Sequence, residues 1–190
     1  MGVRHIVVNL RYLRYVISNV LSARTTTSKL AVAVAVCAVF FVAILAIAAY
    51  FDPSIRVLHV FEALPFLLGA ALCLDRKKFG YALAAVSGAF WLWTAGCLTS
   101  FVRNGFERVV MLARTGAVDR VDILIAAPAA LAAGGLVVFS LFGYLRLPGK
   151  SWRDFPLLLA AFILVPVFFI AIFYAFAPQY LGMFHGILRR

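Results

Sequence analysis

The sequence reads LAVAVAVCAVFFVAILAIAAYF over residues 30–51, a run without a single charged side chain. About 20 apolar residues in an α-helix cross a bilayer core, so a run of this length predicts a membrane span. Four further apolar runs of similar length follow at residues 55–74, 80–101, 122–144 and 155–176. The chain of 190 residues is therefore predicted to cross a membrane five times.

The composition supports an all-α, polytopic integral membrane helical bundle. Hydrophobic residues make up 65% of the chain, and the charged residues lie almost wholly between the apolar runs. A helix satisfies its own backbone hydrogen bonds in lipid, whereas an open strand does not. The runs also lack the polar–apolar alternation over about ten residues that marks an outer-membrane barrel. The connections are too short for a separate soluble domain, so one bundle over residues 30–177 is expected.

The first 29 residues contain no acid but several basic residues, and their apolar residues recur at helical spacing. This pattern predicts a basic amphipathic helix at residues 1–29 that lies among anionic lipid headgroups. This helix is best explained as a segment that fixes the orientation of the chain in the membrane. The alternatives are a mitochondrial targeting segment or an element that docks to a partner. A basic tail at 178–190 is predicted to lie at the interface as well.

The distribution of Lys and Arg predicts the orientation. If the N-terminus is inside, the inner segments hold 11 basic residues and the outer segments hold seven. The positive-inside bias therefore favours an inner N-terminus and an outer C-terminus. The four Arg in the loop after the third run argue against this orientation, because they would lie outside. The excess of Arg over Lys and the abundant Ala suggest a bacterial inner membrane, with the mitochondrial inner membrane as the alternative.

A second amphipathic segment is expected at residues 102–117, where Phe106, Val109 and Val110 interleave with charged side chains. It either lies flat on the outer leaflet or prolongs the third span, and Asn104-Gly105 predicts a break between the two.

Ionisable residues inside the predicted spans are the best functional leads. His59 and Glu62 are three residues apart and therefore share one helix face. An acid at the centre of a span costs about 2.5–3.5 kcal/mol on the insertion scale, so such a residue is expected to face protein or water. Asp122 and Thr94 lie on the same predicted side of the membrane. The candidate polar site is thus His59, Glu62, Asp122 and Thr94, in the outer half of the bundle and within reach of Gln179 and His185.

Each of these residues also has a plainer interpretation. His59 lies near the end of its span, where it can reach the interface without further function. Glu62 can be a structural carboxylate bonded to Arg56, Arg120 or a neighbouring helix, or an inter-subunit contact. Asp122 can be a first-turn acid that the helix dipole favours.

The last span is almost purely apolar. Phe162, Phe169, Phe173 and Phe176 recur at roughly helical spacing, which predicts a lipid-facing stripe or a surface for another membrane subunit. Prolines at 65, 128 and 166 are each expected to kink or loosen a helix.

The remaining chemistry is defined by what the sequence lacks. It contains no metalloprotease, nucleophile-elbow, Walker or CxxC motif, so no enzyme activity is predicted. No cofactor is predicted, and no ligand spacing supports a metal site. The net charge of +11 flanks membrane spans and is better explained by topology than by nucleic-acid binding.

Two functions follow as expectations. Short loops, small-residue helix faces and the phenylalanine stripe favour a non-catalytic accessory or scaffold subunit of a larger membrane complex, or a homo-oligomer. The alternative is a small proton- or cation-coupled channel or transporter that uses the polar site.

Overall fold

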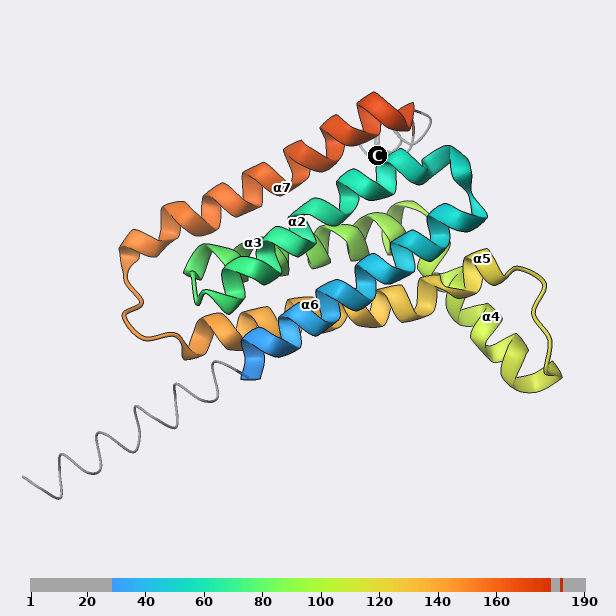
Figure 1. Cartoon of the computed structure of the whole chain (residues 1–190), viewed down its shortest axis with the longest axis horizontal. Helices are drawn as coiled ribbons and strands as arrows, with labels where there is room; N and C mark the ends of the chain where they lie inside the picture. Colours follow the sequence, from blue (N-terminus) through green and yellow to red (C-terminus); the bar gives the residue numbers. More distant parts are fainter. Residues whose placement is uncertain (1–28, 179–181, 183–190) are drawn as a thin grey trace, which may run out of the picture.

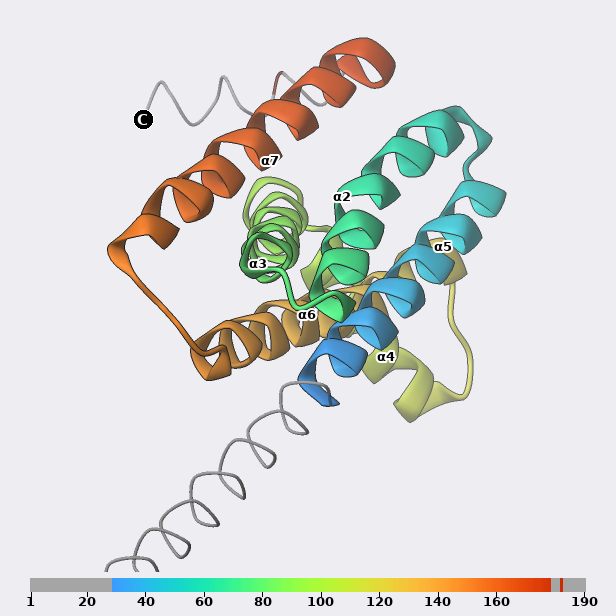
Figure 2. The ribbon, with the colours of Figure 1, turned by 60° about the vertical axis from the view of Figure 1, so that its left-hand side comes forward.

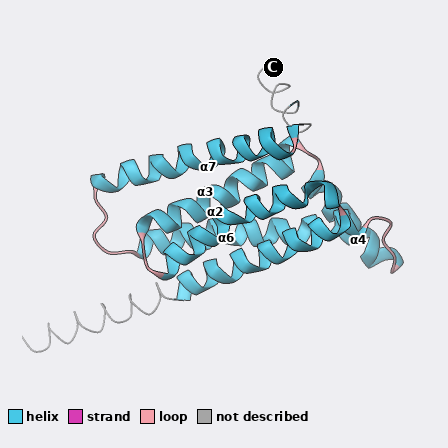
Figure 3. Ribbon diagram, turned by 45° about the horizontal axis from the view of Figure 1, so that its top comes forward, coloured by secondary structure: helices cyan, strands magenta, loops and turns pink. Residues whose placement is uncertain are grey.

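The computed structural model describes residues 29–178 and residue 182. The basic segment at 1–29 therefore lies outside the described residues except for Lys29, as does almost all of the tail at 178–190, including Gln179 and His185. The described residues are mostly helical, with short loops between the helices and no strand among them (Figure 3).

Five helices are long and apolar enough to cross a membrane, so the prediction of an all-α membrane bundle is confirmed. The first span is Lys29–Phe51. The second is a 3-10 turn, η1 (Pro53–Ile55), continued by α2 (Arg56–Leu74). The third is α3 (Lys78–Trp93) with a π-helical last turn, η2 (Thr94–Leu98). The fourth joins α5 (Val121–Leu124) to α6 (Ala126–Arg146), and the fifth, α7 (Phe155–Phe176), follows the 3-10 turn η3 (Trp152–Asp154).

Local sequence explains where several of these elements begin and end. The Asp52 side chain accepts a hydrogen bond from the Ser54 amide at 3.0 Å and so caps η1. Pro128 lacks the N–H that would continue the hydrogen-bond ladder, and the α-helix is interrupted at Ile125, between α5 and α6. The helices α2 and α7 continue through Pro65 and Pro166, so the chain is interrupted at only one of the three prolines.

Helix α3 is the central helix of the bundle. It contacts α2, α6 and α7, and Figure 2, which looks almost along its axis, shows it between these three. The first span joins the same core through Phe41, which packs on Phe66 at 4.4 Å and edge-on to Trp91 at 4.9 Å between ring centroids. Figure 1 shows the first span, α2, α3, α6 and α7 running roughly alongside one another, with α4 projecting at one end.

Small residues bring α3 close to α6. A Cβ atom added to Gly88 would lie 2.8 Å from the backbone oxygen of Ala133, and one added to Gly143 would collide with the ring of Tyr81. Membrane helices pack in this way because, without a hydrophobic effect between them, close van der Waals contact holds them together. Helices α3 and α6 therefore contact each other closely at Gly88 and at Gly143.

The amphipathic segment is a helix, α4 (Phe101–Thr115), but the predicted break at Asn104-Gly105 is wrong. The chain breaks at Thr99 and Ser100 instead, and Gly105 lies inside α4. A Cβ atom at Gly105 would lie 2.8 Å from Cβ of Ala126, so the missing side chain serves close packing of α4 on α6. Phe106, Val109 and Val110 stay exposed on the apolar face of α4.

The phenylalanine stripe of the last span does not form one lipid-facing surface. Phe162 is 68% exposed, whereas Phe169 is completely buried and contacts Phe66 and Phe90. Helical spacing places both residues on a similar face of α7, but the bundle covers that face only around Phe169. The prediction of a uniform stripe is therefore wrong.

An ion pair ties the start of α7 to the start of α3. The Lys78 ammonium lies 2.9 and 2.8 Å from the two carboxylate oxygens of Asp154, which also accepts a hydrogen bond from the Ser151 amide at 3.1 Å. The hydrogen bond from Lys78 is the main cause that holds the pKa of Asp154 below its usual value, and the hydrogen bond from the Ser151 amide is the second. We refer to Lys78 and Asp154 as the basal clamp, because they lie at the end of the bundle where the first span begins.

Candidate functional site

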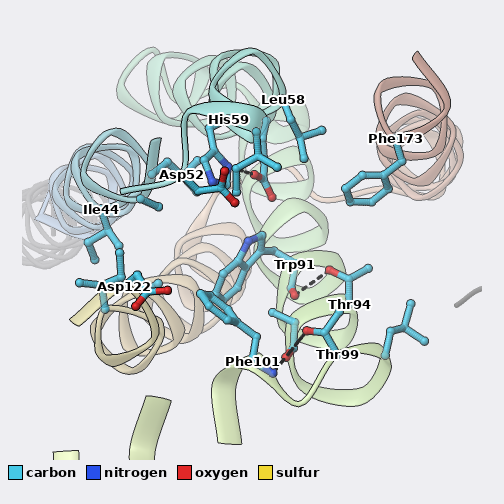
Figure 4. Close-up of a pocket in the computed structure, with 18 residues that line it drawn as sticks. Ile44, Asp52, Leu58, His59, Trp91, Thr94, Thr99, Phe101, Asp122 and Phe173 are labelled. Atoms are coloured by element: carbon cyan, nitrogen blue, oxygen red, sulfur yellow. Dashed lines mark hydrogen bonds and ion pairs between the residues drawn. The ribbon is translucent and has the colours of Figure 1, made fainter. Parts of the chain in front are cut away.

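A cavity of about 280 Å³ lies at the end of the bundle opposite the basal clamp. Its walls come from the end of the first span, the start of α2, the end of α3 with η2, the start of α4, the α5–α6 junction and the end of α7 (Figure 4). His59, Glu62, Thr94 and Asp122, the four residues of the polar site proposed from the sequence, all line this cavity.

His59 and Glu62 form a hydrogen-bonded pair in the cavity wall. Nδ1 of His59 lies 2.7 Å from Oε2 of Glu62, and the two side chains are 13% and 6% exposed. The spacing of three residues on α2 creates this pair, because it places both side chains on one face of the helix. The ring of His59 thus turns to Glu62 rather than to the helix end, and Glu62 bonds neither Arg56 nor Arg120.

One atom of this pair has no partner. Nε2 of His59 is buried, and no hydrogen-bond partner lies within reach of it among the described residues. A buried polar atom left in this state costs about 1–3 kcal/mol of desolvation free energy. The arrangement therefore leaves a donor or acceptor position, according to the tautomer of the ring, available to a water molecule or ligand.

Two further carboxylates line the cavity nearer its mouth. Asp52 bonds the Ser54 amide, as described above, and also its hydroxyl. Asp122 lies in the first turn of α5 and pairs with Arg120, whose guanidinium nitrogens are 2.9 and 2.6 Å from its two oxygens. Arg120 compensates the charge of Asp122, so the net negative charge of the walls comes from Asp52 and Glu62 when His59 is neutral.

The acidic character of the cavity contrasts with the rest of the chain. The chain has seven acids and 18 basic residues, yet the lining contains Asp52, Glu62 and Asp122 and no Lys or Arg. Such a distribution attracts cations and repels anions.

Thr94 lies at the start of the π-helical turn η2. Its hydroxyl donates to the carbonyl oxygen of Trp91 at 2.9 Å, and the hydroxyl of Thr99 donates to that of Ala95 at 3.0 Å. Both hydroxyl protons are thus committed to the backbone, so these side chains offer lone pairs, not protons, to the cavity. Turns with π-helical geometry occur frequently at functional sites, which makes this wall notable.

Aromatic side chains close the inner end of the cavity. Figure 4 places the indole of Trp91 among the labelled residues, with Asp52 and His59 on one side and Phe101 on the other. Deeper in the bundle Trp91 packs on Phe41, which packs on Phe66. The cavity therefore ends on an aromatic floor at its inner side.

Sequence reasoning did not identify Asp52, Trp91 or Thr99 as parts of this site. The signal for Asp52 was present, because it lies directly between two spans at the same end as His59. The position of Thr99 in the wall depends on the π-helical turn before it, for which the sequence has no pattern. Among the described residues no group of three or more His, Cys, Asp or Glu is arranged to hold a metal ion.

The function has to be argued from the site itself. Comparisons with protein-family models, with curated proteins and with solved structures found no significant match to the chain.

Proposed function

We propose that the protein takes up a proton or a cation in the cavity and moves it across the membrane, as a small coupled transporter does. The observation that carries this proposal is the largely buried His59–Glu62 pair in a cavity that no Lys or Arg lines. Ionisable residues within a membrane are costly and commonly mark an ion or proton pathway.

The depth of the pair supports this role. Glu62 is six residues beyond Arg56, or about 9 Å along α2 at the helical rise of about 1.5 Å per residue. It is therefore well inside the apolar part of the span, where an acid without function would be poorly tolerated.

The aromatic floor beneath the cavity also fits a carrier better than an open pore. A carrier exposes its site to one side at a time, and the aromatic floor separates this cavity from the other side. Transport then requires a second conformation in which the first span or α2 moves relative to α3. Helices α3 and α6, which are in close contact, would stay fixed relative to each other during this movement.

The test is flux in proteoliposomes that hold the purified full-length protein. A potential is imposed with potassium and valinomycin, and the internal pH is followed with a trapped fluorescent dye. Glu62→Gln is nearly isosteric but lacks the charge, and we expect it to lower the flux tenfold or more. Glu107→Gln is the matched control, because Glu107 lies on the exposed face of α4, outside the cavity. Equal flux through Glu62→Gln and the unaltered protein would sink the proposal.

A non-catalytic accessory or scaffold subunit is the second candidate function. The observation in its favour is the outer face of α7, where Phe162 and Tyr174 are 68% and 75% exposed. Lipid covers such a face as readily as another subunit, so composition alone does not decide. Purification from native membranes in mild detergent tests it: a stoichiometric foreign subunit supports this role, and a lone species counts against it.

A further inference from the structure

We propose that the cation accepted by the cavity is an organic ammonium with an apolar body. This inference rests on the proposed function and specifies its substrate class. It follows from the donor groups, the apolar walls and the aromatic rings of the same cavity.

The donor groups do not suit a bare metal ion. Ca²⁺ takes six to eight oxygen ligands and Mg²⁺ six, close together around one point. The three carboxylates instead have separate partners, namely Ser54 for Asp52, His59 for Glu62 and Arg120 for Asp122. The cavity therefore offers dispersed negative charge rather than a coordination shell.

The walls are mostly apolar. Six of the 18 lining residues are polar or charged, and the other 12 are aliphatic, aromatic or Ala. A hydrated metal ion would gain nothing from Leu58, Ile125 or Ile44, whereas alkyl and aryl groups gain by leaving water. A mostly apolar pocket with a few convergent polar groups is the usual form of a site for small organic ligands.

Three rings complete the recognition of an ammonium group. Trp91, Phe101 and Phe173 line the cavity, and each comes from a different element. Aromatic faces attract quaternary and alkylated ammonium ions, with Trp the most effective, and the attraction increases when water is excluded. The side chain of Glu62, 6% exposed, lines the same cavity and supplies the charge partner.

Isothermal titration in mild detergent tests the inference, with benzyltrimethylammonium chloride as the probe. Its uncharged carbon isostere, neopentylbenzene, has almost the same shape and serves as the matched control ligand. We expect saturable binding of the cation and at least tenfold weaker binding of the isostere, because the charge–carboxylate and cation–π terms are lost. Sodium and calcium chloride are expected neither to bind measurably nor to compete.

Two variants connect the signal to the site. Glu62→Gln is expected to weaken binding of benzyltrimethylammonium tenfold or more, and Trp91→Leu to weaken it several-fold. Glu107→Gln should leave it unchanged. Circular dichroism melting shows whether each variant is folded, and Trp91→Phe, which keeps an aromatic face, replaces Trp91→Leu if that variant is unfolded.

The outcomes separate this inference from the proposed function. If neither benzyltrimethylammonium nor its isostere binds, or if both bind equally, the substrate class is wrong. If calcium or sodium displaces the organic cation with comparable affinity, it is wrong as well. Proton flux that still depends on Glu62 would then leave the proposed function standing, whereas flux independent of Glu62 would remove it.

Discussion

Replacing Gly88 by Ala is expected to force α3 and α6 apart. The added Cβ atom would lie 2.8 Å from the carbonyl oxygen of Ala133 and 3.1 Å from Cγ2 of Val137. Carbon–oxygen contacts in proteins normally lie at about 3.3–3.6 Å, so the helices must separate by roughly 0.5 Å at this point. The oxygen belongs to the backbone of α6 and has no rotamer by which to move away.

The free-energy change follows from this geometry. Overpacking of a well-packed interface costs about 1–3 kcal/mol. Gly134→Ala is the matched control, because Gly134 lies inside α6, as Gly88 lies inside α3, but its added Cβ would have no atom of a packed neighbour within 4 Å. That variant should gain about 0.5–1 kcal/mol, since Ala is a better helix former than Gly.

The assay is unfolding in mild detergent by titration with dodecyl sulfate, followed by far-ultraviolet circular dichroism. The free energy of unfolding should fall for Gly88→Ala and stay level or rise for Gly134→Ala. A Gly88→Ala protein as stable as Gly134→Ala would refute the close packing of α3 on α6, and with it the fixed frame on which Trp91 is mounted.

Two further predictions concern the basal clamp and α7. Asp154 has a lowered pKa, so its carboxylate stabilises the fold above the usual value of about 3.9, and this contribution is lost as the pH falls through the lower pKa of the folded state. Thermal unfolding from pH 7 to pH 3 should therefore show a drop in midpoint below about pH 4, which is much smaller in Asp154→Asn; an equal drop in both proteins would exclude the basal clamp as its source. Phe169→Ala should lower the free energy of unfolding by about 3–5 kcal/mol, whereas Phe162→Ala should change it by less than about 0.5 kcal/mol; similar losses in the dodecyl sulfate assay would show that both rings are equally buried.

Sequence periodicity and hydropathy were enough to predict the membrane bundle, because both depend on short-range properties of the chain. A span needs only length and apolarity, and the pairing of His59 with Glu62 needs only the helical repeat. The small-residue helix faces were visible for the same reason, since their residues recur at helical spacing.

The errors arose where contacts between distant segments override local preference. Asn-Gly commonly marks a turn, yet Gly105 stays helical because α6 lies against it and leaves no room for a side chain. Phe162 and Phe169 have equivalent positions in the helical repeat, but only the second has a neighbour to cover it. The pairing of Lys78 with Asp154 joins residues far apart in sequence, and no local sequence pattern predicts it.

The π-helical turn at Thr94–Leu98 makes the geometry of the cavity sensitive to a single codon. A π-helical turn amounts to one extra residue inserted in an α-helix. Deleting one residue there, for instance Gly96, where an added Cβ would meet no atom of a packed neighbour within 4 Å, would return the helix to regular α-helical winding. Every residue beyond it would then rotate by about 100° around the helix axis. Thr99 and Phe101 would leave the cavity together, and α4 would depart in a different direction. An insertion or deletion at this turn thus changes the wall of the site in one genetic event, at the cost of the close contact between α4 and α6 at Gly105.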